Sequence, residues 1–110
     1  MFKYNQYILS DIIQFVMSSG FKETNFCIYS NSTNPLNLID EYWISDYPEV
    51  INDKDIYPYD VRSKSLNLVY HGKNFVDVIC STLAQKPDAT EDELLAALIY
   101  YSQHKTFMKF

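Results

Sequence analysis

The chain has 110 residues, of which 47% are hydrophobic and 21% are charged, and its formal net charge is −5. This length is typical of a single domain, 1–110, whose core is large enough to hold the fold without disulfides or a structural metal. The negative charge argues against direct binding to nucleic acid and against binding to anionic membranes, and it favours a basic protein as the partner.

The hydrophobic pattern predicts an α+β fold in which a small, mostly antiparallel sheet packs with about three helices. Helices are predicted where apolar residues recur at i, i+3, i+4 and i+7, and strands where short apolar or alternating runs end in turns. In chain order we expect a helix near 8–19, a strand over 26–29 that is buried on both faces, and a second strand within 36–44. A loop with short extended pieces follows over 45–61, and then a strand over 66–70. Two helices are expected near 73–86 and 91–104, and the apolar tail over 106–110 should pack on the core or form an edge strand.

Local signals mark the ends of the predicted helices. Ser10 and Asp11 are candidate caps for the first helix and Asn74 for the second, because short polar side chains accept hydrogen bonds from free N–H groups. The strongest signal is the capping box of Thr90 and Glu93, in which each side chain accepts a hydrogen bond from the backbone N–H of the other residue. The box places the start of the last helix at residue 91.

Residues 40–60 form the most distinctive segment. They contain seven acidic residues and one lysine, so their net charge of −6 exceeds in magnitude the −5 of the whole chain. They also contain one tryptophan and four tyrosines but no phenylalanine, and Tyr and Trp are enriched on surfaces that become dry on binding. We therefore predict a surface for a basic partner, formed by Asp40, Glu41, Tyr42, Trp43, Asp46, Tyr47, Asp53, Asp55, Tyr57, Tyr59 and Asp60. Two alternatives stay open: the segment can be a solvated loop, and Trp43 can face the core beneath it.

The sequence offers little chemistry for catalysis or metal binding. One of the two histidines, His71 and His104, could act as a general base, but a turn residue and a cation at a helix C-terminus are the simpler interpretations. The cysteines and histidines lack the close spacing of a zinc site, and the acidic segment lacks the glycine and glutamate of a calcium loop. We therefore predict no catalytic residues, no cofactor and no metal.

The cysteines and the chain ends bear on the compartment. Cys27 and Cys80 each lie in an apolar stretch, and we expect both thiols to be free and buried. No apolar run is long enough to span a membrane, and the N-terminus lacks the features of a signal peptide. We expect a cytoplasmic protein.

The C-terminal run carries a resemblance. Residues 85–101, Q-K-P-D-A-T-E-D-E-L-L-A-A-L-I-Y-Y, resemble the end of a family of small acidic bacterial proteins of uncharacterised function. More broadly, the chain is similar in size, charge and style to the immunity proteins of contact-dependent growth inhibition and related polymorphic toxin systems. That resemblance implies a cytoplasmic protein, not an enzyme, that binds a cognate toxin domain and blocks it. It assigns no binding residue.

The leading hypothesis is an immunity protein that covers the basic active site of a nuclease toxin, an RNase or a DNase, in a 1:1 complex. Its carboxylates would stand where the phosphates of the nucleic acid stand, and its aromatic side chains would supply buried anchors. An acidic nucleic-acid mimic that inhibits a host defence protein is the first alternative, and a small enzyme or metal-binding module is the second. The sequence does not separate the first two.

Overall fold

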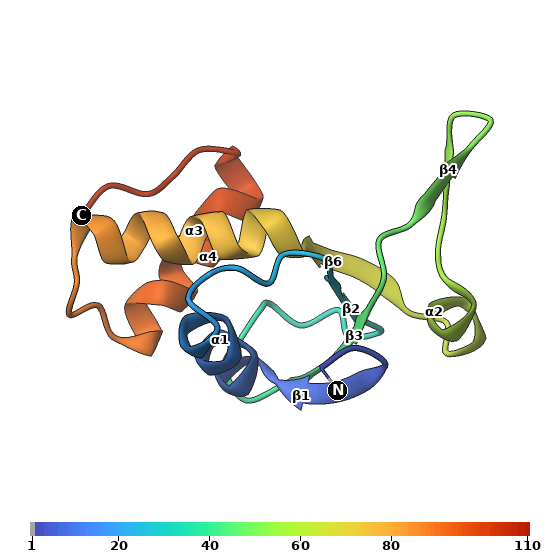
Figure 1. Cartoon of the computed structure of the whole chain (residues 1–110), viewed down its shortest axis with the longest axis horizontal. Coiled ribbons are helices and arrows are strands. Elements are labelled where there is room, and N and C mark those ends of the chain that lie inside the picture. The colour runs from blue at the N-terminus through green and yellow to red at the C-terminus, as the bar shows by residue number, and fades with distance from the viewer. Residues whose placement is uncertain (1) are drawn as a thin grey trace.

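The computed structural model describes residues 2–110, and it confirms the predicted α+β class (Figure 1). A four-stranded antiparallel sheet and a separate two-stranded sheet are joined with four helices. In chain order the elements are β1 (Asn5–Ile8), α1 (Leu9–Ser18), β2 (Cys27–Ser30), β3 (Glu41–Ser45), β4 (Glu49–Ile51), β5 (Lys54–Ile56), α2 (Tyr59–Ser63), β6 (Asn67–His71), α3 (Gly72–Gln85) and α4 (Glu91–His104).

The main sheet has the strand order β1-β3-β2-β6, and each neighbouring pair is antiparallel. Its central strand β2 is buried along its whole length, as predicted. Because side chains alternate along a strand, Ile28 packs with the three long helices on one face while Cys27 and Tyr29 point to the other face. The sheet therefore separates two apolar clusters, which decides where each aromatic side chain of the acidic segment lies.

The larger cluster, the main core, joins α1, α3 and α4 to one face of the sheet. The smaller cluster, the minor core, lies on the opposite face, where α2 and the segments beside it cover the sheet. The minor core consists of Cys27, Tyr29 and Val61, packed with Trp43, Tyr47, Tyr57, Leu66 and Leu68.

The predicted helices appear where the periodicity placed them, and α4 begins at the predicted residue. The Glu93 N–H donates to Thr90 Oγ1 at 3.2 Å, and the Thr90 N–H donates to Glu93 Oε1 at 3.0 Å, so the capping box is confirmed. The tail after α4 forms no strand. It folds back instead, because Met108 packs against the main core and the Phe107 ring stacks on Tyr101 at 5.4 Å.

The predicted cap of the first helix is wrong. Neither Ser10 nor Asp11 caps α1, because the helix begins at Leu9 directly after β1. The N–H of Leu9 donates to the carbonyl of Asp40 at 3.2 Å, so a neighbouring backbone segment satisfies the helix end. The Ser10 hydroxyl instead donates to the Glu91 carboxylate at 2.6 Å and ties α1 to α4.

The predicted cap of the second helix is wrong for the same reason. The helix α3 begins at Gly72, directly after β6, so Asn74 lies inside its first turn. The N–H of Gly72 donates to the carbonyl oxygen of Phe26 at 2.8 Å. A Cβ atom at position 72 would lie 2.1 Å from that oxygen, so the close approach of the two backbones requires glycine.

Three further expectations change. The strand predicted within 36–44 is β3 over Glu41–Ser45, while 37–40 form a turn in which Asn37 Oδ1 accepts the N–H groups of Ile39 and Asp40. The segment 45–61 holds a hairpin and a short helix. Both cysteines are free, but only Cys27 is buried, and the expectation that Cys80 is buried is wrong. Among residues 2–110, no helix is long and apolar enough to cross a membrane.

Candidate protein-binding surface

The structure divides the predicted binding surface into a packed part and a projecting part. Tyr42 belongs to the packed part and is a correction to the prediction. Its side chain is only 3% exposed, it lies in the main core beside Ile44, and its hydroxyl accepts the N–H of Asn37 at 3.3 Å. Residues two apart on a strand share a face, so Tyr42 and Ile44 face the helices. Tyr42 cannot act as an anchor for a partner.

Trp43 points to the opposite face of the sheet and is half-buried in the minor core. Its indole Nε1–H donates to the Asp60 carboxylate at 2.7 Å, and the Lys64 ammonium lies 4.7 Å from the centre of the Trp43 ring. The side chain thus holds α2 and the following turn against β3. Both Trp43 and Asp60 have structural partners already, so their first role is to support the surface rather than to contact a partner.

Tyr47 and Tyr57 have a similar structural role. The Tyr47 hydroxyl donates to the carbonyl of Thr24 at 3.0 Å and accepts the N–H of Lys73 at 2.9 Å, and burial raises its pKa. The Tyr57 ring meets Tyr29 edge-on at 5.6 Å. Tyrosine suits these positions because a half-buried ring and a hydrogen-bonded hydroxyl are both satisfied there. The enrichment of Tyr and Trp in residues 40–60 is therefore explained largely by the minor core.

Two of the predicted carboxylates are also engaged. Asp46 forms an ion pair with Lys3 at 2.9 Å and accepts a hydrogen bond from the Tyr4 hydroxyl at 2.6 Å, and these contacts lower its pKa. Asp40 accepts a hydrogen bond from the Asn37 amide at 2.7 Å. Glu41 is exposed at the start of β3. It lines a pocket together with Trp43 and Lys64, and this pocket is separate from the one at the base of the β4–β5 hairpin, which is described below.

The projecting part is the hairpin 49–56, which we call the arm. In Figure 1 it extends away from the rest of the molecule, and all of its residues are exposed. Its strands pair closely with each other and make at most marginal contact with other elements. Asn52 and Asp53 form its two-residue turn with φ of 52° and 63°, the positive angles that a type I′ turn requires. The sequence Asp53-Lys54-Asp55 is therefore part of a hairpin turn, not of a calcium loop.

The arm carries exposed apolar side chains among its acids. Val50, Ile51 and Ile56 are 70%, 48% and 37% exposed. Val50 lies opposite Asp55 on one face, while Ile51 and Ile56 share the other face with Glu49 and Lys54. Exposed apolar side chains on both faces of a projecting element mark a candidate interaction site, because an isolated two-stranded hairpin gains little from exposing them. These three residues were missed by the sequence reasoning, although β-branched residues on both sides of a polar pair are a hairpin signal.

A shallow pocket of about 190 Å³ lies at the base of the arm, between β5 and α2. Tyr59, which is 77% exposed, lines it together with Glu49 and Ile56. The Arg62 guanidinium lies 5.9 Å from the centre of the Tyr59 ring, and its Nε–H donates to the carbonyl of Tyr57 at 3.0 Å. Of the aromatic side chains that were predicted to be anchors, only Tyr59 is exposed enough to contact a partner directly.

The surface that remains is smaller than the predicted one and comprises both faces of the arm and its base. It consists of Glu49, Val50, Ile51, Asp53, Asp55, Ile56 and Tyr59, of which Asp53, Asp55 and Tyr59 were predicted. These side chains offer carboxylates beside apolar groups, an arrangement that suits a basic protein surface with apolar recesses. Within residues 2–110, no group of three or more His, Cys, Asp or Glu side chains is placed to hold a metal ion.

Comparison with known proteins identifies a family whose function is unknown. A family model described as a domain of unknown function, DUF7716, matches residues 7–110. No curated protein and no solved structure matches the chain.

Proposed function

The chain belongs to the DUF7716 family, whose function is unknown, and we propose that it is an immunity protein that binds and neutralises a cognate toxin domain. The proposed target is a nuclease, an RNase or a DNase, bound 1:1 in the cytoplasm without a cofactor or direct contact to nucleic acid. The observation that carries the proposal is the arm, an exposed acidic hairpin on which Val50, Ile51 and Ile56 are 37% to 70% exposed.

The chemistry of the arm fits the active site of a nuclease. A nuclease holds its substrate through cationic side chains, and such side chains pair with carboxylates as they do with phosphates. Asp53 lies in the turn and Asp55 on β5, so the carboxylates reach the target first. Val50, Ile51 and Tyr59 then supply side chains that become buried on binding, which is where most binding energy resides.

The mode of binding depends on side chains rather than on strand addition. Each strand of the arm has three residues, and in an antiparallel pair alternate residues direct their N–H and C=O groups inward. Few backbone groups of the arm are therefore free to pair with a strand of the partner. An arm that projects by its tip and its side chains is suited to entering a cleft, as inhibition of an enzyme requires.

The direct test uses the product of the neighbouring gene, which the proposal requires to contain the toxin domain. Val50→Ser combined with Ile51→Ser should weaken binding by at least about tenfold and abolish protection of cells that express the toxin, because each buried apolar anchor contributes about 1–2 kcal/mol. The matched control is Ile39→Ser combined with Phe110→Ser, which removes exposed apolar groups, 80% and 46% exposed, outside the arm. Calorimetry measures the affinity, and nuclease activity measures the neutralisation.

Two outcomes would overturn the proposal. If the purified chain neither binds that toxin domain nor lowers its nuclease activity, the immunity function is wrong. If both double variants weaken binding equally, or neither does, the arm is not the binding surface. Circular dichroism on each variant separates a loss of binding from a loss of folding.

A further inference from the structure

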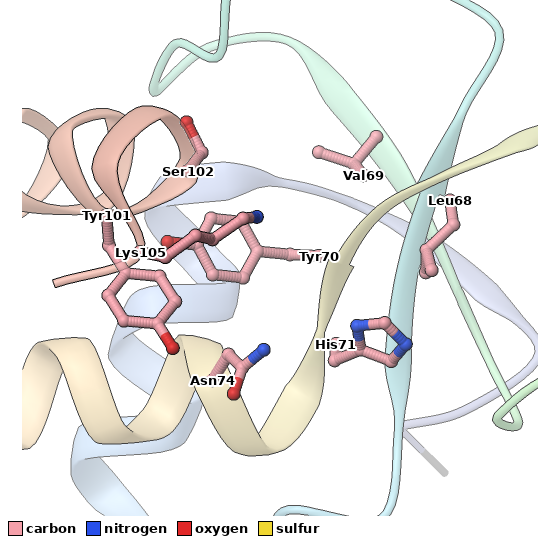
Figure 2. A pocket seen from close by; sticks show the side chains of 8 residues that line it. All are labelled: Leu68, Val69, Tyr70, His71, Asn74, Tyr101, Ser102 and Lys105. Atoms are coloured by element: carbon pink, nitrogen blue, oxygen red, sulfur yellow. The ribbon is translucent and has the colours of Figure 1, made fainter.

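A second pocket carries the opposite electrostatic character from the arm. It has a volume of about 180 Å³ and lies between β6, the first turn of α3 and the C-terminal end of α4 (Figure 2). No acidic residue lines it, although the chain as a whole has a net charge of −5. Its polar lining includes the ammonium of Lys105, the amide of Asn74 and the hydroxyl of Tyr101.

These three side chains line the pocket, and in the part of the chain that the structure describes their polar groups are not used in hydrogen bonds or ion pairs that stabilise the fold. Figure 2 shows the Tyr101 hydroxyl pointing towards the Asn74 amide, and in this view the Lys105 side chain is seen in front of the Tyr70 ring. Within residues 2–110, no side-chain hydrogen bond or ion pair engages the Lys105 ammonium, the Asn74 amide or the Tyr101 hydroxyl. The Tyr70 hydroxyl, by contrast, donates to the carbonyl of Leu98 at 2.8 Å.

The backbone of Lys105 is strained, which draws attention to its side chain. Lys105 ends α4 in the left-handed region, with φ 57° and ψ 27°, and its N–H donates to the carbonyl of Tyr101 at 2.8 Å. Glycine or asparagine usually occupies this position because a Cβ atom is disfavoured there. The geometry of the cap does not require a lysine, although a cation suits the negative end of the helix dipole, and the same side chain also lines the pocket.

The pocket is lined by apolar side chains and by one cationic side chain. Val69 and the ring of Tyr70 give the pocket an apolar lining, whereas the Leu68 side chain lies on the other side of β6, in the minor core (Figure 2). Lys105 is the only lysine or arginine that lines the pocket, and one positive charge matches a monoanion better than a doubly charged phosphate. We propose that this pocket binds a carboxylate carried on a short apolar group.

In the proposed complex the Lys105 ammonium pairs with the carboxylate, and the Asn74 amide and the Tyr101 hydroxyl donate hydrogen bonds to its oxygens. The apolar group packs on Val69 and the ring of Tyr70. The ligand has two possible sources, a free organic acid and the C-terminal carboxylate of a polypeptide whose last residue is apolar. The proposal is independent of the arm and of the toxin, because it concerns different residues.

The test is a titration of the isotope-labelled full chain followed by amide NMR shifts. Butanoate should shift the amide signals of Asn74, Tyr101 and Lys105 with a single saturable curve, and a ligand of this size should bind with a Kd on the order of millimolar. A short peptide that ends in valine, with a free or an amidated C-terminus, distinguishes the two sources. If the free peptide binds about tenfold tighter than butanoate, the ligand is a chain terminus; otherwise it is a free acid.

The variants are chosen so that loss of binding is not loss of folding. Lys105→Gly removes the ammonium and relieves the left-handed strain, so it should fold with an unchanged or higher Tm and bind at least about tenfold more weakly. Asn74→Asp adds a first-turn acid to α3, which has none, and should oppose the carboxylate by like charge. Lys109→Gly is the matched control for charge, because Lys109 does not line the pocket, and it should bind as the wild type does.

Three results would overturn the proposal. No saturable shift up to about 50 mM butanoate would show that the pocket is not a carboxylate site. Phosphate binding as tightly as butanoate at the same signals would show that the anion class is wrong. Equal affinity for Lys105→Gly and Lys109→Gly would show that the Lys105 ammonium is not the pairing group.

Discussion

At the scale of the residue, the structure distinguishes side chains that the composition groups together. Tyr42 and Tyr59 lie in the same acidic segment, yet one is 3% exposed in the main core and the other is 77% exposed at the base of the arm. The strand alternation that separates Tyr42 from Trp43 is a period of two, and it does not reveal which of the two faces the main core because both faces of β3 are covered by apolar groups.

The requirement for glycine at position 72 leads to a prediction about stability. Gly72→Ala should lower the free energy of unfolding by about 1–3 kcal/mol, because the new methyl group would force β2 and α3 apart in a packed region. The clash is with the backbone oxygen of Phe26, so no side-chain rotation relieves it. Urea denaturation followed by circular dichroism measures the change.

Gly20 provides the comparison. A Cβ atom at this position has open space around it, but the φ angle of +70° disfavours every residue except glycine and a few polar ones. Gly20→Asn should therefore be tolerated within about 1 kcal/mol, whereas Gly72→Asn should be as damaging as Gly72→Ala. Equal tolerance of asparagine at both positions would contradict the assigned close approach.

Asp46 leads to a prediction about pH. Its hydrogen bonds from Lys3 and then from Tyr4 lower its pKa below the ordinary value of 3.8. A carboxyl group with a depressed folded pKa stabilises the protein above its unfolded pKa, and this stabilisation is lost as the pH falls through the folded value. Asp46→Asn should therefore be less stable than the wild type at neutral pH, by less than about 1 kcal/mol for so exposed a pair, and the gap should close below pH 3.8.

The measurement is the urea midpoint across the acid range. Asp53→Asn is the matched control, because Asp53 has no ion-pair or hydrogen-bond partner within residues 2–110 and asparagine suits its positive φ. The control should match the wild type at neutral pH. A gap for Asp46→Asn that stays constant as the pH falls below the ordinary carboxyl pKa would contradict the assigned contacts.

At the scale of the element, local patterns predicted the helices and long-range pairing decided the rest. The capping box of Thr90 and Glu93 involves residues three apart, so the sequence contains the whole interaction. The strand β1, N-Q-Y-I, is too polar to be recognised, and it exists because Asn5–Ile8 pairs with Glu41–Ile44 far along the chain. The arm was expected only as short extended pieces because its turn, Asn52-Asp53, lacks the glycine that makes a hairpin evident.

The difference between the arm and the main sheet leads to a prediction about dynamics. Amides of β2, which is buried on both faces between β3 and β6, should exchange with solvent most slowly, near the rate of global unfolding. Amides of β4 and β5 should exchange fastest among the strands, because the arm is exposed and packs against little else. Hydrogen-exchange NMR on the free chain measures both.

The same experiment on the complex tests the role of the arm. Binding of the toxin domain should slow exchange in the arm and leave β2 unchanged. Arm amides that are as protected as those of β2 in the free chain would show that the arm is not an independent element. Arm amides that stay unprotected in the complex would show that it is not the binding surface.

At the scale of the whole molecule, the negative charge is unevenly placed. Residues 40–60 carry the net charge of the chain, but Asp40, Asp46 and Asp60 are engaged in the fold. Within residues 40–60, the carboxylates left to act on a partner are therefore mostly on the arm, and among residues 2–110 no acidic residue lines the pocket beside Lys105. The composition predicted that the electrostatic potential of the surface is negative. Only the contacts of each carboxylate show where on the surface the potential is most negative.

This placement predicts that the arm directs the approach of a basic partner. The triple variant Glu49→Gln, Asp53→Asn, Asp55→Asn should lower the association rate constant for the toxin domain by about tenfold at low salt and flatten its dependence on salt. The dissociation rate should change less, because exposed charges mainly speed the encounter. Stopped-flow fluorescence over a range of ionic strengths measures both rate constants.

A second triple variant separates the position of the charges from their number. Asp11→Asn, Asp88→Asn, Asp92→Asn changes the net charge from −5 to −2 exactly as much as the arm variant does, but these exposed acids lie on or beside α1 and α4. If position governs the encounter, this variant should keep most of the wild-type association rate and its salt dependence. An equal loss in both variants would mean that overall charge, rather than the arm, attracts the partner.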